Sequence, residues 1–288
     1  MFATIWETVF THPFLNLMIL FYHFFGDNLG LAILGIAVIA RLLMIPLVKK
    51  QTKMTKQMAM LKPELDKLQK KYGNDKERLA QEQVKLYKRI GYNPLGCFAT
   101  FIPQLIILSV LIGVIQSVTN SSLEGLYPWV VDITGITREA SINTHFLFWD
   151  MTKSFNNVSK EFGRLSSQAL PYILLSLMVG VTQYFTTLFT QKMQEVGKPK
   201  KKKVEKKKEK TQEETVAAMQ ESMQKSTMLM FPLMTVIFTI SMPAALGWYW
   251  LLQSLLLIIQ YMLLDFDKTK KGTQNLLDVF KKDKFKKQ

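Results

Sequence analysis

The sequence is poor in the side chains that catalysis and redox chemistry use most. It holds a single cysteine, Cys97, so no disulfide can form within one chain. Its only histidines, His12, His23 and His145, lie outside the apolar segments assigned below. No HExxH, GxSxG or glycine-rich phosphate loop occurs. We therefore expect a protein that is not an enzyme, with Cys97 packed as a small apolar side chain.

Charged residues are missing from long stretches of the chain. Residues 91–118, 165–191 and 228–264 contain no Asp, Glu, Lys or Arg, and residues 29–48 contain only Arg41. Yet the whole chain has a formal net charge of +15 and is 48% hydrophobic. Apolar blocks that alternate with charged blocks are typical of a chain that crosses a bilayer, which needs about 20 mostly apolar residues per helix. The sequence therefore predicts an all-α integral membrane protein.

The last apolar block is too long for one span. As a single helix, residues 228–264 would measure about 55 Å, against a hydrocarbon core of about 30 Å. The motif MPAALG at 242–247 supplies a proline and a glycine near its middle. We expect two helices joined there by a tight turn. The predicted transmembrane helices are then five: residues 29–48, 94–118, 169–191, 228–244 and 245–265.

Basic residues set the direction of these spans. Lys and Arg outnumber Asp and Glu by 13 to 5 in residues 49–90, by 11 to 6 in 192–227 and by 8 to 4 in 265–288, whereas 119–164 holds 4 against 5. Because basic loops stay in the cytoplasm, we expect the N-terminus outside and the C-terminus inside. Residues 119–168 then form an extracytoplasmic loop, residues 192–227 a basic cytoplasmic linker and helix, and residues 266–288 a basic cytoplasmic tail.

The N-terminal residues 1–28 leave two interpretations open. Their apolar run FLNLMILFYHFF is only about 12 residues long, which is short for a span, and no basic leader precedes it. Aromatic residues within it favour a helix that lies at the outer interface. A sixth span over residues 5–25 is the alternative.

Residues 49–93 are predicted to form a basic antiparallel helical hairpin in the cytoplasm. The sequence GND at 73–75 suits the turn between its helices, and Pro63 is expected to open or kink the first helix. Its surface is either a solvated face near anionic lipid or a docking arm for a partner. The apolar stripe with heptad spacing on the first helix comprises Met54, Met58, Leu61, Leu65, Leu68 and Tyr72.

Two further segments are strongly basic and of low complexity. Residues 198–210 read KPKKKKVEKKKEK, and the chain ends in KKDKFKKQ. Such segments attract phosphate, in lipid headgroups or in RNA, without reading base sequence. In the C-terminal tail the predicted docking residues are Lys281, Lys282, Lys286 and Lys287.

Arg41 is the one charge inside a predicted span. An arginine at the centre of a spanning helix costs roughly 2.5–3.5 kcal/mol on insertion scales, so it needs compensation. Residues 29–48, 91–118, 165–191 and 228–264 contain no Asp or Glu that could pair with it. Three solutions remain open: the side chain extends to the cytoplasmic interface, it bonds carbonyl and amide groups of the bundle, or it faces a water-filled groove.

Polar side chains on other spans favour the groove. Ser176, Gln183, Thr187 and Thr190 lie close together around one helix. Tyr249, Gln253 and Gln260 share a face of another helix, beside Trp250 and Ser254, and a third helix carries Thr100 and Gln104. Each stripe alone could be interhelical hydrogen bonding. Taken together they predict a polar groove lined by Arg41, Gln104, Gln183, Thr187, Tyr249, Trp250 and Gln253.

The order of several motifs resembles the YidC/Oxa/Alb family of membrane protein insertases. The resemblance is carried by GLAILGIAVIARLLMIPLVKKQ, by LYKRIGYNPLGCFATFIPQLIIL, by FLFWD, by LMVGVTQYFTTLFTQKM and by FPLMTVIFTISMPAALGWYWLLQ. Residues 119–143 look like an insertion before FLFWD.

The resemblance implies a groove open to the cytoplasm and to lipid, in which Arg41 attracts acidic or polar parts of an incoming protein. It also implies a bacterial plasma (inner) membrane location, nascent membrane proteins as substrates, the ribosome as a partner of the basic tail and hairpin, and no nucleotide or metal. Anionic lipids and the Sec translocase are further expected partners. Two alternatives share these features: a small-anion transporter, and an assembly chaperone without insertion activity.

Overall fold

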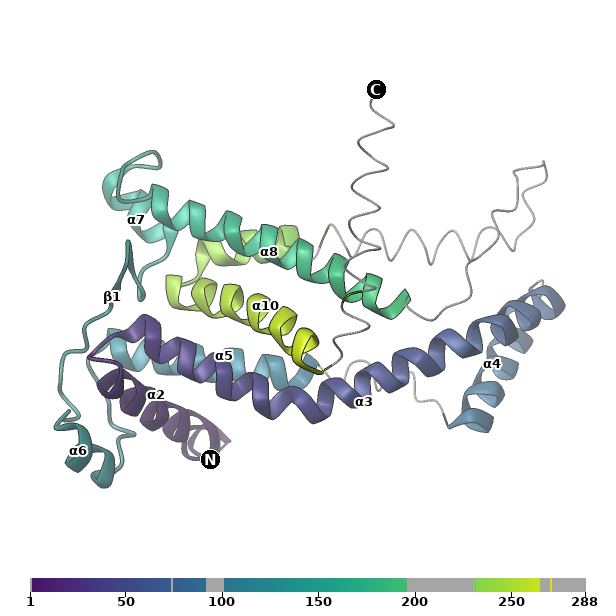
Figure 1. The fold of residues 1–288 in the computed structure, drawn as a ribbon, viewed down its shortest axis with the longest axis horizontal. Coiled ribbons are helices and arrows are strands. Elements are labelled where there is room, and N and C mark those ends of the chain that lie inside the picture. Colours follow the sequence, from purple (N-terminus) through teal and green to yellow (C-terminus); the bar gives the residue numbers. More distant parts are fainter. Residues whose placement is uncertain are drawn as a thin grey trace. The chain divides into compact units, whose positions relative to one another are not determined.

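The computed structural model describes residues 2–73, 75–91, 101–195, 230, 232–264 and 270 (Figure 1). The chain divides into two units. Unit 1 comprises Met1–Met44, Pro103–Thr186 and Phe231–Leu264, and unit 2 comprises Ile45–Ile102, Thr187–Met230 and Asp265–Gln288. The described residues are mostly helical, as the sequence predicted.

In unit 1 the chain begins with three consecutive helical pieces and continues through long apolar helices. The elements are α1 (Phe2–Trp6), the π-helical turn η1 (Glu7–Thr11), α2 (His12–Phe24), α3 (Leu29–Tyr72, which continues into unit 2), α5 (Phe101–Thr119), α6 (Pro128–Thr134), β1 (His145–Phe146), β2 (Trp149–Asp150), α7 (Phe155–Phe162), α8 (Leu170–Glu195), a short helix Pro232–Ser241, and α10 (Ala244–Leu264). The two strands pair antiparallel, with Phe146 opposite Trp149.

Among the described residues, three helices are long and apolar enough to cross a membrane. They are Leu29–Lys49 within α3, Leu170–Thr190 within α8, and Ala244–Leu263 within α10. Leu105–Thr119 and Pro232–Ser241 are shorter apolar helices. The break expected near MPAALG is confirmed, since the short helix ends at Ser241 and α10 begins at Ala244. Proline at position 243 has no N–H to continue the first helix and fits the start of the second.

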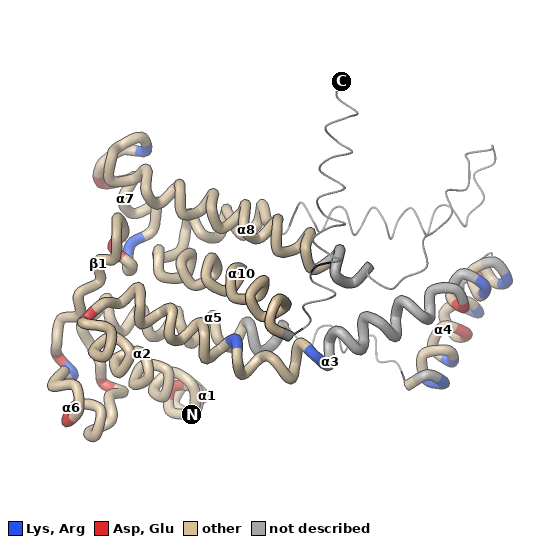
Figure 2. The backbone as a smooth tube through the Cα atoms, in the orientation of Figure 1, with Lys and Arg blue, Asp and Glu red and all other residues tan. Residues whose placement is uncertain are grey.

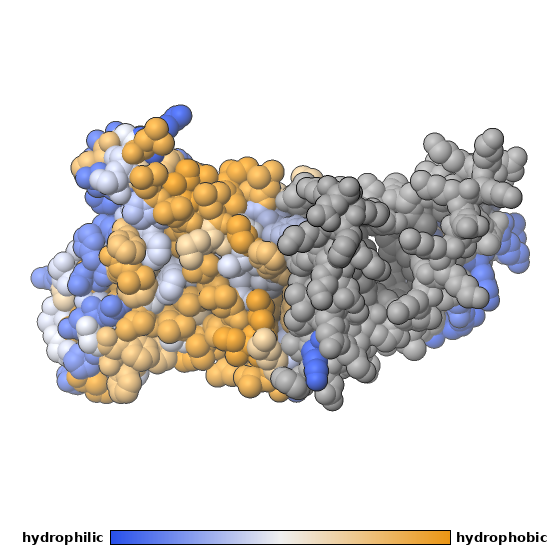
Figure 3. Space-filling model, turned by 45° about the horizontal axis from the view of Figure 1, so that its top comes forward, coloured by the Kyte–Doolittle hydropathy of each residue, from blue (hydrophilic) through white to orange (hydrophobic). Residues whose placement is uncertain are grey.

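The core of unit 1 lies where α2, α3, α5, α8 and α10 face one another. Ile33, Val110, Leu175 and Tyr249 are each at most 1% exposed. Large apolar residues also remain exposed on the outer faces of the same helices, among them Leu42, Leu105, Val181 and Leu263. Figure 3 shows a face on which apolar residues dominate the described helices. Exposed apolar faces on long helices are what a lipid environment requires.

Apart from Arg41 on α3, charged residues avoid the helical core of unit 1. In Figure 2, α5 and α10 carry no charged position, and charges gather in the segments around α6 and α7 and on α4 (Lys76–Ile90). This distribution agrees with the alternation of apolar and charged blocks in the sequence.

One helix replaces the two that the sequence predicted between Leu29 and Tyr72. The predicted span 29–48 agrees with the apolar stretch Leu29–Lys49. However, α3 continues from it through Pro46 and Pro63 to Tyr72, so Pro63 opens no separate helix. Lys, Gln, Met, Leu and Glu, which are strong helix formers, dominate the flanking residues and offset the lost N–H. After α3, the Asp75 side chain caps α4 by accepting from the Arg78 amide, and Gly91 ends it with a φ of 65°.

Candidate functional site

The intramembrane arginine bonds a main-chain group. Arg41 on α3 donates from Nη2 to the carbonyl oxygen of Gln253 on α10, at 2.6 Å. Its side chain is partly buried. A carbonyl oxygen has two lone pairs, so it can accept from Arg41 in addition to its partner within the helix. Of the three solutions left open by the sequence, the structure shows a contact of the second kind, with a carbonyl of the bundle.

The same two helices are joined by further bonds from side chains to carbonyls. Gln253 donates from Nε2 to the carbonyl of Ala37 on α3, at 3.1 Å. Nearer the start of both helices, Trp248 donates from Nε1 to the carbonyl of Gly30, at 3.0 Å. Gln253 therefore touches α3 through both its main chain and its side chain, and it fixes the register between α3 and α10 at the level of Arg41.

A second polar contact lies between α10 and α8. Ser254, the residue after Gln253, donates from Oγ to Oε1 of Gln183 at 3.2 Å. Figure 1 shows α10 between α3 and α8. Arg41, Gln253 and Gln183, three of the predicted groove residues, therefore lie along one polar line that crosses α10. We call Arg41, Gln253, Ser254 and Gln183 the polar line.

Two tyrosines of α10 complete the surroundings of Arg41. The hydroxyl groups of Tyr249 and Tyr261 both interact electrostatically with the guanidinium, and Tyr249 is fully buried. Sequence analysis had selected Tyr249 but missed Tyr261. The signal was present, because Tyr261 follows Gln253 by eight residues and so lies close to the same face of the helix.

Several buried polar atoms near this line have no hydrogen-bond partner within the part of the chain that the structure describes. They are Nε of Arg41 and Oε1 of Gln253 and Gln260. A buried polar group left unsatisfied costs about 1–3 kcal/mol. One donor and two acceptors therefore remain available to water or to a polar ligand.

Of the other predicted site residues, the structure describes some and not others. Trp250 is partly buried and packs against the core of unit 1. Thr187 belongs to unit 2, so the structure does not set it beside Arg41. Leu65 is partly buried on α3. The side chains of Gln104, Met54, Met58 and Leu61, and all of Lys281, Lys282, Lys286 and Lys287, fall outside the described residues.

The end of the bundle at which α3, α8 and α10 begin is covered by residues 145–153. These residues contain the two strands and the three residues that follow them, and we call them the β1–β2 segment. The amides of Ala244 and Ala245, the first two of α10, donate to the carbonyls of Lys153 and Met151 at 2.8 and 3.0 Å. Trp149 donates from Nε1 to the carbonyl of Pro171, at the start of α8. The segment thus satisfies amides of a helix N-terminus that have no partner within the helix.

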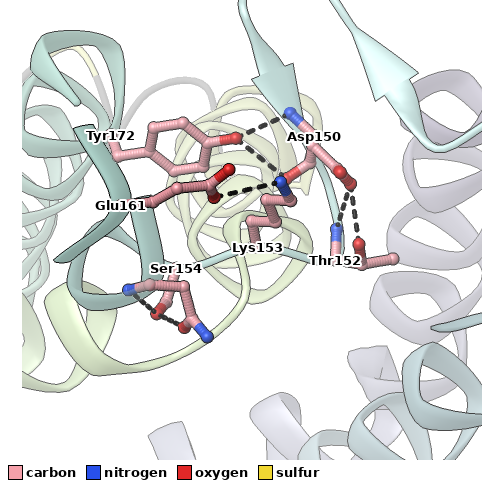
Figure 4. A network of polar contacts seen from close by, with 7 residues as sticks. Asp150, Thr152, Lys153, Ser154, Glu161 and Tyr172 are labelled. Atoms are coloured by element: carbon pink, nitrogen blue, oxygen red, sulfur yellow. Dashed lines mark hydrogen bonds and ion pairs between the residues drawn. The ribbon is translucent and has the colours of Figure 1, made fainter. Parts of the chain in front are cut away.

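A polar network and an aromatic cluster hold this cover in place. The Asp150 amide donates to the Tyr172 hydroxyl at 2.9 Å, and the Asp150 carboxylate accepts from Thr152 (Figure 4). Burial raises the pKa of Asp150, but the hydrogen bonds from Thr152 and Thr144 and the charge of His145 outweigh it, so the pKa is lowered overall. The Trp248 ring lies 5.2 Å from Phe146 and 6.2 Å from Trp149, measured between centroids. From the sequence, FLFWD could be recognised only as a motif, without this capping role.

Comparison with known proteins places the chain in a family. A sequence model described as 60Kd inner membrane protein matches residues 20–271. The chain belongs to this family. Members named for their activity include membrane protein insertase YidC 2 of Bacillus anthracis, 29% identical over 265 residues that make up 90% of this chain and 81% of the relative.

Other relatives of the family differ in length. Membrane protein insertase MisCA of Bacillus subtilis (strain 168) is 28% identical over 93% of this chain and 82% of its own length. Membrane protein insertase YidC of Nitratidesulfovibrio vulgaris is 27% identical over 88% of this chain but only 38% of its own length. The resemblance to the insertase family is thereby confirmed. With its apolar helices, this family member is a bacterial membrane protein.

Proposed function

We propose that this protein inserts newly made membrane proteins into the bilayer and assists their folding, without nucleotide. The observation that carries the proposal is the polar line around Arg41, found in a chain whose relatives are named membrane protein insertases. A cation held between apolar helices, with buried donors and acceptors still available, suits transient contact with polar parts of a passing polypeptide.

The proposed topology has five spans with the N-terminus outside. The three long apolar helices and the two shorter ones, Leu105–Thr119 and Pro232–Ser241, supply them. In unit 1, α3, α8 and α10 begin at the end covered by the β1–β2 segment. The chain order then requires α5 and the helix Pro232–Ser241 to run in the opposite direction. The covered end is the outer one, because the segments that follow the other ends carry the excess of Lys and Arg.

For residues 1–28 we propose an interfacial helix rather than a sixth span. Thr11 touches Gly113 on α5, and the Phe21 ring touches Gly35 on α3. Each glycine is six residues, about 9 Å, from the outer end of its own helix. Thr11, at the end of η1, and Phe21 on α2 are about 15 Å apart along the helical axis and therefore lie at one depth. A helix that crosses its neighbours at constant depth, about 9 Å below their ends, lies at the boundary of headgroups and acyl chains.

We further propose that α3 after Val48 and α4 form the cytoplasmic hairpin. Arg89, near the end of α4, is paired with Glu64 on α3 at 2.6 Å. This long-range contact supports an antiparallel arrangement of the two helices. The basic hairpin and the basic tail are then the surfaces that receive client proteins, ribosomes and anionic lipid headgroups, and a Sec translocase is a further proposed partner.

The proposed mechanism uses the line as a polar stop on the way through the bilayer. A hydrated groove from the cytoplasm to Arg41 shortens the apolar distance that an exposed client tail must cross. A cation in low dielectric attracts a carboxylate more strongly than it would in water. The covered outer end prevents a continuous pore. Transfer of the client's apolar segment into lipid then supplies the free energy.

The decisive experiment reconstitutes the purified protein in liposomes with a single-span client that bears an acidic exposed tail. We expect insertion that falls about tenfold in Arg41→Ala, the effect of about 1.4 kcal/mol on a rate, and that is partly retained in Arg41→Lys. Uptake of small anions without client insertion would favour the transporter. Protection of the client from aggregation without insertion would favour the chaperone.

A further inference from the structure

We propose that α6 is a lipid-contacting anchor whose Trp129 and Ile133 side chains lie in the interfacial region of the outer leaflet. These two residues are four apart and therefore share a face of the helix. They are 51% and 61% exposed, respectively, whereas Val130 and Thr134, about 100° further around the helix, are buried. The apolar outward pair thus remains largely exposed, on a helix whose adjacent face is already packed in unit 1.

The depth of α6 follows from its attachment to α2. Asn16, in the middle of α2, donates from Nδ2 to the carbonyl of Gly125 and accepts from the amide of Tyr127, both at 2.7 Å. The backbone at Gly125 lies so close to His12 that an added Cβ would be 2.3 Å from the ring. Residues 120–127 therefore fold back from the outer end of α5 onto α2, and α6 starts at the level of α2.

The chemistry of the exposed face fits a lipid interface. The Tyr127 and Trp129 rings are 6.3 Å apart, and paired Tyr and Trp side chains are typical of the membrane–water boundary. Asp132, also exposed, lies beside them on the helix, as expected for the headgroup side. The inference rests on the proposed depth of α2 but not on insertion activity. Its consequence is that residues 119–143 pin α2 to the bilayer surface.

The test places an environment-sensitive fluorophore on α6. In a Cys97→Ser background, Ile133→Cys is labelled and the protein is reconstituted in liposomes. We expect blue-shifted emission that is quenched by lipids carrying a nitroxide near the headgroup. The matched control is Glu139→Cys, an exposed position in the following turn, whose label should report water. Equal, aqueous emission at both positions would overturn the proposal, as would shielding at 133 that needs an added membrane protein.

A second readout avoids labelling. Lipids brominated near the headgroup should quench the intrinsic tryptophan fluorescence of the unlabelled protein, and Trp129→Phe should lose a measurable part of that quenching. The Trp6→Phe variant is the control: it shows how much quenching is lost when a different tryptophan of unit 1 is removed. An unchanged quenched fraction in Trp129→Phe would contradict the anchor. Client insertion is measured on the same liposomes, so loss of lipid contact and loss of insertion are scored separately.

Discussion

Arg41 reaches across from α3 to a main-chain oxygen of α10, the carbonyl of Gln253, at 2.6 Å. Because the acceptor belongs to the backbone, a substitution at position 253 removes this hydrogen bond only if it breaks the helix. The contact therefore positions the guanidinium independently of side-chain chemistry on α10. In the described part of the chain, the ion pairs join other residues and leave Arg41 without a carboxylate.

Charge and hydrogen bonding at position 41 can be separated by Arg41→Gln. The glutamine amide carries no charge but keeps a donor that can approach the Gln253 carbonyl. We therefore expect the free energy of unfolding to change by less than about 1.5 kcal/mol. Insertion of a client with an acidic tail should fall, whereas insertion of a client with an uncharged tail should not. Liposome insertion with the two matched clients checks this, and equal loss for both would argue against an electrostatic role.

Replacing Gln253 by Leu should affect activity more than stability. The change removes the bond to Ala37 but also removes the buried Oε1 that has no partner among the described residues. These effects oppose each other, so the expected stability change is within about 1 kcal/mol. Client insertion should drop. Ser176→Ala is the control, because that hydroxyl is buried and bonds only its own helix at Tyr172. A Gln253→Leu variant with full insertion activity would remove the residue from the proposed site.

Asn16→Ala should destabilise the protein by loosening residues 120–127 from α2. Asn16 is 2% exposed and its amide bonds both Gly125 and Tyr127. Its loss leaves those groups to find other partners and should cost about 1–3 kcal/mol. Thermal unfolding in detergent and amide exchange at Tyr127 measure the effect. Thr8→Ala serves as control, since Thr8 is exposed and its hydroxyl donates to the carbonyl of Thr4, four residues earlier in the chain.

Acid should weaken the packing of residues 145–153 through Asp150. Its pKa is lower in the folded chain than in the unfolded one, so the unfolded chain binds more protons in acid. The stabilisation is complete above about pH 4, the unfolded value, and is lost as the pH falls through the lower folded value. Amide exchange of residues 145–153 should therefore rise only in acid. In Asp150→Asn this acid-dependent rise should disappear.

Particular residues show how far the sequence could go. The proline and glycine of MPAALG located the break between two helices, because both residues act on the local backbone. Arg41, Gln183 and Gln253 could be chosen in advance, because a polar group in an apolar helix needs compensation wherever it lies. Tyr261 and the capping role of Lys153 and Met151 could not, since they depend on which helices are neighbours. Pro63 opens no separate helix, because α3 already runs through it from the apolar residues that precede it.

The membrane class, the apolar segments and the presence of an uncompensated arginine follow from the sequence alone, because they depend on composition and local periodicity. What that arginine touches was decided only by the fold. The partner is a carbonyl 212 positions away, and every residue offers a carbonyl, so no pattern in the chain could single this one out. Only the packing of α3 on α10 selects it.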